Sequence, residues 1–376
     1  MARTTVRVLS LIAAAAVAAT VTACSPPASD SAAASTPAGS ATSVADLGGM
    51  DALVTAAKAE GKLNVIALPP DWTNYAEVIS TFESTYGITV SSAQPDASSA
   101  DEITAAKQLA GQDTAPDVFD LSQSVTVANT DMFAPYKVAT IGDVPDGLKD
   151  PNGKWTNDYG GYMSIGYDSA TVPAPTTVAD LMKPEYKGKV ALNGDPTQAG
   201  AAFNGVMMAS LASGGSADDV SPGVDFFSKL NKAGNFLPLD PTPATIESGQ
   251  TPVVIDWDYL NAAESTKTGG LASWKVVVPK GAVVGGYYAQ AINAQAPHPA
   301  AARLWQEFLY SDVGQNLWLK GGARPVRADA MITSGTIDKG LLAKLPAVSG
   351  TPVFLTPAQT DAAAATLNST WAKAIA

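Results

Sequence analysis

Segments typical of strands alternate with segments typical of helices along most of this chain of 376 residues. The apolar run from Leu63 to Leu68 ends at a Pro-Pro pair and predicts a strand. Apolar residues at helical spacing over 76–86 predict a helix that stops before Gly87, and 88–90 predict a second strand. Such alternation predicts parallel sheets flanked by helices, in which ligands bind beyond the carboxyl ends of the strands.

The alternation continues through the rest of the chain. Helices are expected over 51–60, 102–110 and 224–232, and strands over 116–120, 252–256 and 274–279. About 330 residues follow the N-terminal tail, which is more than one hydrophobic core usually organises. The predicted fold class is therefore α/β with two lobes.

The first residues have the features of a secretory signal. Arg3 and Arg7 precede an apolar run from Val8 to Val21, which is too short to span a bilayer comfortably and is followed by no stop-transfer charges. We expect residues 1–23 to be removed as a signal peptide and the protein to act outside the cytoplasm.

Cys24 is the only cysteine in the chain, and it follows Val-Thr-Ala in the pattern of a bacterial lipobox. An unpaired thiol in an exported protein calls for an explanation, and lipidation of Cys24 supplies one. Acyl chains would then hold the protein at the membrane without a transmembrane helix. The alternative is a chance cysteine after an ordinary cleavage site.

The stretch after Cys24 consists almost entirely of Ser, Ala, Pro, Thr and Gly, and it predicts a flexible tether that ends at about residue 45. The chain as a whole is acidic, with a formal net charge of −12. This charge argues against a nucleic-acid partner and favours a cationic or neutral ligand over an anionic one. The charge could equally serve only to keep a secreted protein in solution.

Four segments resemble the type II periplasmic binding proteins, and specifically the family 1 extracellular solute-binding proteins, which include spermidine/putrescine, ferric iron, thiamine and phosphonate binders. The loop Asp71 to Tyr75, with a helix ending Phe-Glu-Ser-Thr-Tyr-Gly-Ile-Thr-Val, is similar to the opening of the polyamine binders. The strand at 116–120, the Lys-Gly-Lys strand and Asp-Pro turn within 186–197, and the Ala-Pro-His-Pro segment at 296–303 complete the resemblance, which covers about residues 60 to 330.

This resemblance implies two lobes with a hinge and a ligand cleft between them. Lobe 1 is expected over 46–165 and again over 280–330, lobe 2 over 166–279, and a C-terminal helical segment on lobe 2 over 331–376. The family crossovers would fall near 162–167 and 279–292, where glycines are compatible with hinges. The resemblance also implies a monomer that binds a small solute, needs no cofactor, and serves the permease and ATPase subunits of an ABC importer.

An organic ammonium ligand needs carboxylates to pair its charge and aromatic rings to desolvate its methylenes. The sequence combines both in the loop at 71–75 and in the cluster at 256–259, just past a buried strand. The resemblance implies that the ends of several other segments also face the cleft. The candidate ligand-binding residues are therefore Asp71, Trp72, Tyr75, Asp120, Asp195, Asp256, Trp257, Asp258, Tyr287 and Tyr288.

The chain departs from the polyamine pattern after 276–281, where that family carries a Trp-x-Asp pair and this chain reads Ala-Val-Val-Gly-Gly-Tyr-Tyr. A smaller or less cationic solute is therefore an alternative. Ferric iron is another, because iron binders supply adjacent tyrosines, although theirs belong where this chain has Trp257 to Tyr259. We expect no metal, since His298 is the single histidine and follows a proline at a helix start.

An enzyme, such as a secreted hydrolase, is the alternative from another class. The sequence contains no Gly-x-Ser-x-Gly elbow, no Walker glycine loop and no His-Glu-x-x-His helix. A Ser-His-Asp triad could form only through His298. The sequence therefore predicts a solute-binding protein that does no chemistry, with a polyamine or related amine as the first candidate ligand.

Overall fold

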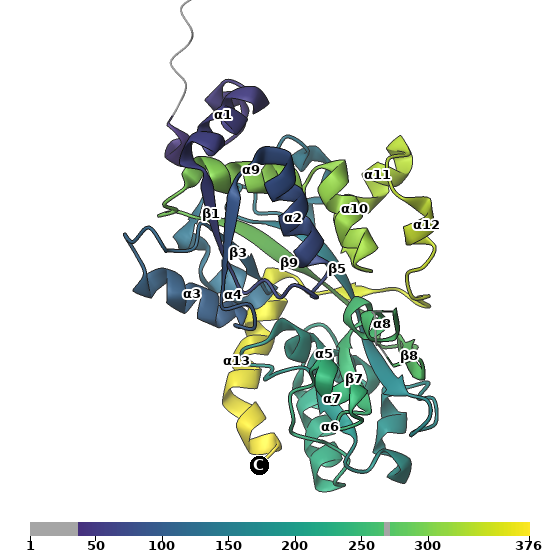
Figure 1. Cartoon of the computed structure of the whole chain (residues 1–376). Coiled ribbons are helices and arrows are strands. Elements are labelled where there is room, and N and C mark those ends of the chain that lie inside the picture. The colour runs from purple at the N-terminus through teal and green to yellow at the C-terminus, as the bar shows by residue number, and fades with distance from the viewer. Residues whose placement is uncertain (1–36, 267–270) are drawn as a thin grey trace, which may run out of the picture. The chain divides into compact units, whose positions relative to one another are not determined.

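The computed structural model describes residues 37–266 and 271–376 (Figure 1). The predicted signal peptide and Cys24 lie outside the described residues. The strands are β1 (Lys62–Ile66), β2 (Thr89–Ala93), β3 (Val118–Leu121), β4 (Phe133–Ala134), β5 (Thr156–Asp168), β6 (Val190–Leu192), β7 (Val253–Trp257), β8 (Trp274–Val277), β9 (Val284–Asn293), β10 (Arg324–Pro325) and β11 (Val353–Phe354).

The α-helices are α1 (Met50–Glu60), α2 (Tyr75–Tyr86), α3 (Ser99–Gln108), α4 (Gln123–Ala128), α5 (Gly200–Ala212), α6 (Ser221–Lys232), α7 (Pro243–Glu247), α8 (Asp258–Thr266), α9 (Pro299–Leu309), α10 (Asp312–Lys320), α11 (Ala328–Ser334), α12 (Lys339–Leu342) and α13 (Pro357–Ala374). Each segment predicted from the sequence as a helix or strand corresponds to one of these elements, with ends that differ by a few residues.

Strand β5 runs through both lobes. Its first half, 156–162, pairs with β9, and its second half, 163–168, pairs with β7 and β8. We call the part around β1–β4, most of β9 and α9 lobe 1, and the part around β6–β8 and α5–α8 lobe 2 (Figure 1). The long strand and its partner β9 therefore form the connection between the lobes, near the predicted crossovers.

The prediction of parallel sheets is only partly right. The pairs β1–β2 and β6–β7 are parallel, as strand-helix-strand units require. The pairs β3–β9, β5–β9 and β5–β7 are antiparallel. The returning strand β9 therefore lies antiparallel to β3 and β5, whereas its neighbour β11 is parallel to it.

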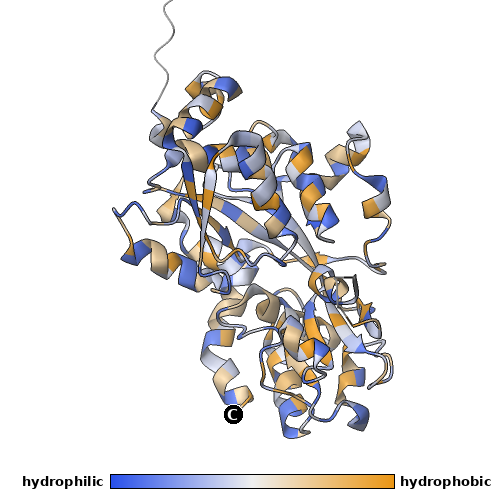
Figure 2. Ribbon diagram, viewed as in Figure 1, coloured by the Kyte–Doolittle hydropathy of each residue, from blue (hydrophilic) through white to orange (hydrophobic). Residues whose placement is uncertain are grey.

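Local signals explain where several helices begin and end. Gly61 and Gly87 follow α1 and α2 with φ of 70° and 69°, a left-handed conformation that glycine adopts at low cost. Helix α3 begins with a capping box in which Ser98 and Asp101 satisfy each other's backbone donors. Many helices carry both hydrophobic and hydrophilic residues (Figure 2), which is the pattern of helices packed on one side, whereas α5 is buried over most of its length.

Residues 37–45 belong to lobe 1, which corrects the predicted end of the tether. Ala41 is fully buried. The guanidinium of Arg303 on α9 donates to the carbonyl oxygens of Ala41 and Gly39 at 2.9 and 3.1 Å. Composition alone predicted a tether here because it does not show that a distant arginine binds this backbone.

The C-terminal segment predicted for lobe 2 is divided between the lobes. Met331 and Ile337 of the α11–α12 region pack with Leu319 of α10, on lobe 1. Helix α13 contacts both α4 and α6, and its Trp371 packs edge-on to Phe227 of lobe 2. The last helix therefore touches elements of both lobes. Across the described ranges, no helix is long and apolar enough to span a bilayer.

Candidate ligand-binding site

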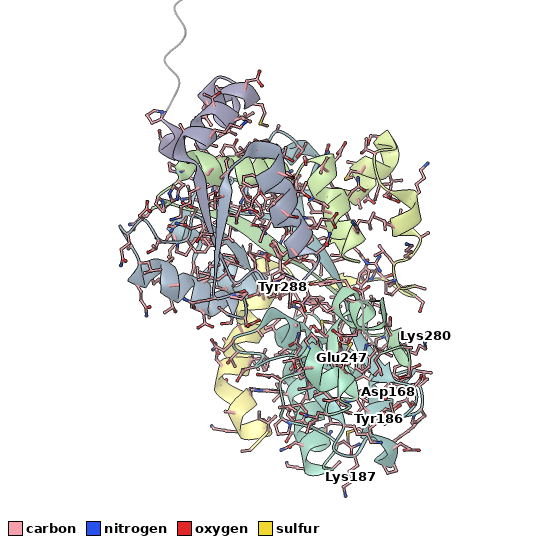
Figure 3. The ribbon with its side chains drawn as sticks, in the orientation of Figure 1. Asp168, Tyr186, Lys187, Glu247, Lys280 and Tyr288 are labelled. Atoms are coloured by element: carbon pink, nitrogen blue, oxygen red, sulfur yellow. The ribbon has the colours of Figure 1, made fainter. Side chains whose placement is uncertain are left out.

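A pocket of about 610 Å³ is lined by residues from both lobes. Lobe 1 contributes the loop after β1, the start of α3 and the end of β3, whereas lobe 2 contributes the start of α5, the loop before α7, and the β7–α8 region. The pocket therefore lies where the carboxyl ends of β1, β3 and β7 meet, as expected for ligand sites in α/β sheets. Tyr288 lines it from the crossover strand β9 and is labelled at the junction of the lobes in Figure 3.

The lining is strongly acidic. No lysine, arginine or histidine occurs among the described residues that line the pocket. The carboxylates come in equal number from the two lobes: Asp71, Asp96, Glu102 and Asp120 from lobe 1, and Asp195, Asp240, Asp256 and Glu264 from lobe 2. Four of these acids, Asp71, Asp96, Asp195 and Asp240, are exposed, and the other four are buried.

Asp120 lies at the end of β3. It and Glu102 are the two buried acids among the lobe 1 residues that line the pocket. Its Oδ2 accepts hydrogen bonds from the hydroxyls of Tyr75 and Tyr159 at 2.8 and 2.6 Å. Burial raises the pKa of Asp120 to about 7. Burial and the nearby charge of Asp120 likewise raise the pKa of Glu102, whose carboxylate accepts a hydrogen bond from the Asp120 N–H.

Asp256 occupies the corresponding place on lobe 2, near the end of β7. It accepts hydrogen bonds from the Asn193 side-chain amide at 2.8 Å and from the Trp257 N–H at 2.7 Å. Burial raises the pKa of Asp256 to about 7. Two buried carboxyls with similar properties, one on each lobe, therefore face the same pocket.

Two aromatic rings, those of Trp72 and Tyr288, line the pocket together with these carboxyls. The Trp72 indole packs edge-on to Tyr288 and Tyr259, at centroid distances of 5.5 and 6.3 Å. Trp257 packs on the same two rings from lobe 2. Such rings can desolvate methylene groups and offer π faces to an ammonium group.

Six of the ten predicted residues line the pocket together, namely Asp71, Trp72, Asp120, Asp195, Asp256 and Tyr288. Tyr75 is fully buried behind Asp120 and contacts it through its hydroxyl. The other three, Trp257, Asp258 and Tyr287, are outside the pocket lining.

Each of those three has a different environment. Asp258 is buried and paired with Arg324 at 3.1 Å. Trp257 and Tyr287 line a smaller cavity of about 50 Å³, which shares Tyr288 with the pocket, and the Tyr287 ring stacks on Phe354. Of the two adjacent tyrosines, only Tyr288 also lines the large pocket.

Sequence reasoning missed several pocket residues. Glu102 is in the first turn of α3 and was predicted only as part of a helix, and Asp240 precedes the Pro-Thr-Pro start of α7. Asn193 was seen only as part of a strand-turn segment. A signal was available for Glu102, because an acid in the first turn after a β–α loop lies at the ligand-binding edge of an α/β sheet.

His298 has a structural role. Its Nδ1 lies 2.9 Å from Asp117 Oδ2, and its backbone N–H donates to the other oxygen of Asp117 at 2.7 Å. It is outside the pocket lining, at the start of α9. The described part of the chain also holds no group of three or more His, Cys, Asp or Glu side chains that could bind a metal ion.

Two lobes joined by crossing strands, with a pocket lined by acids and apolar side chains between them, define a protein that encloses a small ligand. Residues 115–339 match the sequence model of the family described as bacterial extracellular solute-binding protein. The chain belongs to this family, whose members serve ABC transporters outside the cytoplasm. No curated protein sequence matches the chain.

Solved structures confirm the predicted two-lobed, type II periplasmic-binding-protein fold. A putative spermidine/putrescine ABC transporter protein from Listeria monocytogenes aligns with a TM-score of 0.65 and 14% identity over 84% of this chain and 98% of that chain. Iron-bound HitA from Pseudomonas aeruginosa aligns with a TM-score of 0.61 and 19% identity over 83% and 99%. AfuA from Actinobacillus pleuropneumoniae, with fructose-6-phosphate bound, aligns with a TM-score of 0.64 and 18% identity over 84% and 97%. These identities support the fold and not the ligand.

Proposed function

We propose that the pocket binds a small organic cation, a polyamine or a related amine, and that the protein delivers it to the permease of an ABC importer. The observation that carries the proposal is the lining of eight carboxylates, four from each lobe, with no basic residue among the described lining. A cation placed between the lobes would stabilise the ionised forms of Asp120 and Asp256, which burial alone disfavours. Closure of the lobes would then depend on the charge of the ligand.

An extended amine suits this pocket better than a single ion. A volume of about 610 Å³ is within the range of small-molecule sites and far exceeds that of one metal ion. Asp120 on lobe 1 and Asp256 on lobe 2 can each bind one ammonium group of the ligand. Trp72 and Tyr288 can cover the methylenes between the two charges.

The alternative ligands fit less well. A phosphonate or another anion would meet an excess of negative charge. Ferric iron prefers several anionic oxygens at one point, and of the adjacent tyrosines only Tyr288 lines the pocket. Thiamine carries a positive charge and remains a candidate within the cationic class.

We further propose that the mature protein begins at a lipidated Cys24 and acts as a monomer at the outer face of the membrane. The support is the lipobox pattern and the absence of a second cysteine in the sequence. We propose no catalytic activity, since the family binds solutes. Incubation with a bound amine should therefore return the amine intact.

A thermal-shift screen tests the ligand class. Putrescine, spermidine, choline and thiamine are compared with 1,4-butanediol, an alkylphosphonate and ferric citrate. A ligand at a hundred times its dissociation constant stabilises by about 2.7 kcal/mol, which is measurable. We expect stabilisation by one or more of the amines and none by the diol or the phosphonate. Stabilisation by the phosphonate or ferric citrate alone would refute a cationic ligand.

A further inference from the structure

The two carboxylate oxygens of Asp120 have different environments. Oδ2 accepts both tyrosine hydroxyls, from Tyr75 at 2.8 Å and from Tyr159 at 2.6 Å. Oδ1 is buried and has no hydrogen-bond partner among the described residues. Asp120 lines the pocket although only 6% of its surface is exposed. A buried, unsatisfied carboxylate oxygen is costly unless a ligand completes its hydrogen bonds.

The two hydroxyls are themselves fixed by donors on the other side. Trp72 Nε1 donates to the Tyr159 hydroxyl at 2.8 Å, and Gln290 Nε2 donates to the Tyr75 hydroxyl at 3.2 Å. An indole N–H and an amide NH₂ can only donate, so each hydroxyl directs its own proton to Asp120. The arrangement favours the ionised form of Asp120, because hydrogen bonds to a charged carboxylate stabilise it.

We propose that Tyr75 and Tyr159 are positioning residues that make Asp120 a preformed anchor for one ammonium group. The two hydroxyls hold Oδ2 of Asp120 and leave Oδ1 to the ligand. They also set the pH range over which the ligand is captured. The part about the ligand rests on the proposed function. Neither tyrosine lines the pocket, so each acts on the ligand only through Asp120. Tyr159 also lies on β5 directly before Gly160 and Gly161, where β5 passes from one lobe to the other. The anchor is therefore next to the connection between the lobes.

The electrostatic surroundings of Asp120 show why the two donors matter. Burial raises its pKa to about 7, and the hydroxyls of Tyr159 and Tyr75 oppose that rise. Titratable groups that face Asp120 from the neighbouring elements are Tyr75 of α2, Glu102 of α3, Asp158 and Tyr159 of β5, Tyr259 of α8, Tyr288 of β9 and Tyr310 after α9. All of these groups are acids, so none of them offers a positive charge that would stabilise the Asp120 carboxylate. Loss of one hydroxyl donor would therefore shift Asp120 further toward its neutral form.

The first test needs no ligand. Carboxyl-carbon NMR of the full chain labelled with ¹³C-aspartate gives the titration midpoint of Asp120, whose signal is assigned by its loss in Asp120→Asn. We expect Tyr159→Phe and Tyr75→Phe each to raise this midpoint by about one pH unit, the effect of losing one hydrogen bond to a charged group. An unchanged midpoint in both variants would overturn the proposal.

Tyr136→Phe is the matched control. The Tyr136 hydroxyl donates to the buried carboxylate of Glu307 at 2.8 Å, outside the pocket lining. This variant makes the same chemical change and should leave the Asp120 midpoint unchanged. A shift as large as that in Tyr159→Phe would mean a general structural effect and would overturn the positioning role. Tyr75→Phe carries the test if Tyr159→Phe does not fold.

The second test uses putrescine and measures its affinity from pH 5 to pH 8 by calorimetry. For the wild type we expect affinity to fall by up to about tenfold for each pH unit below 7, because the cation must displace a proton. The fall should begin about one unit higher in the two phenylalanine variants. If putrescine binds the wild type with no dependence on pH, the anchor proposal fails while the cationic ligand stands. If no amine binds, the proposed function fails, and the ligand-free titration still decides the role of the tyrosines.

Discussion

The guanidinium of Arg324 lies 3.1 Å from Oδ2 of Asp258. This ion pair distinguishes Asp258 from Asp256, which is only two residues away. Asp258 also accepts the Tyr162 N–H at 3.0 Å, so its negative charge is satisfied within the protein. Asp256 accepts hydrogen bonds from two neutral donors and lines the pocket. The two carboxylates should therefore respond differently to neutralisation.

We expect Asp256→Asn to weaken the binding of an amine such as putrescine by about 1.5–3 kcal/mol, or roughly 10- to 160-fold, because a charge-assisted hydrogen bond is lost while the shape is kept. Calorimetric titration measures this change. The matched control is Asp195→Asn, an exposed acid of the same pocket whose loss should matter less because solvent screens it. Equal losses in both variants would mean that only the overall charge of the pocket counts.

Asp258→Asn should leave amine affinity nearly unchanged and lower the free energy of unfolding. It removes the charge partner of Arg324, whose side chain is only 19% exposed, and breaking a buried pair costs about 3–5 kcal/mol when both partners are enclosed. We expect a loss toward the lower end of that range, measured by urea unfolding. A large loss of affinity without a loss of stability would instead place Asp258 at the ligand.

The stability of the ligand-free protein should depend on pH through Asp256. Burial raises its pKa from 3.8 to about 7, so between these values the folded chain binds more protons at this site than the unfolded chain does. The contribution of Asp256 to the free energy of unfolding therefore becomes less favourable as pH rises through this window. Relative to the wild type, Asp256→Asn should gain stability between pH 5 and pH 8. A constant difference would show that the carboxyl is ionised throughout.

The crossover leaves no room for a side chain at Gly160. A Cβ atom there would lie 2.1 Å from the backbone oxygen of Gly286 on the paired strand β9. We expect Gly160→Ala to lower the free energy of unfolding by about 1–3 kcal/mol or more, because the two strands must move apart. Gly147→Ala, where a Cβ would meet nothing within 4 Å, should be close to neutral. Urea unfolding of both variants makes the comparison.

Cys24→Ala tests the predicted anchor. Without the thiol there is no site for lipidation, so the variant should be released into the medium or remain as an uncleaved precursor. Ligand binding by the folded part should be unchanged. Mass spectrometry of the wild-type protein shows directly whether Cys24 is lipidated. An unlipidated Cys24 in the mature protein, after removal of the signal peptide, would refute the anchor.

The sequence predicted those parts of the fold that depend on local signals. The glycines after α1 and α2, and the apolar spacing within these helices, located them to within one residue. The antiparallel insertion of β9 was not predicted, since strand direction depends on pairing between segments far apart in the chain. The length of the chain and the order of the family-like segments led to the two lobes, and local periodicity alone would not have done so.

The candidate site shows the same division. Acids at the ends of strands, such as Asp120 and Asp256, could be chosen because strand ends meet at the ligand-binding edge. The pairing of Asp258 with Arg324 could not be foreseen, because 66 residues separate the partners. The role of Tyr159 was also missed, since its hydroxyl reaches Asp120 only through the register of β5.

The most direct test of a cationic ligand is calorimetric titration of the protein at pH 7.5 with putrescine and with 1,4-butanediol, which has hydroxyls in place of the amines. A pocket with carboxylates on both lobes should bind putrescine or its longer homologue spermidine at one molecule per chain, and should not bind the diol measurably. Equal binding of the diol and the diamine, or binding of ferric citrate or a phosphonate with no binding of any amine, would contradict it.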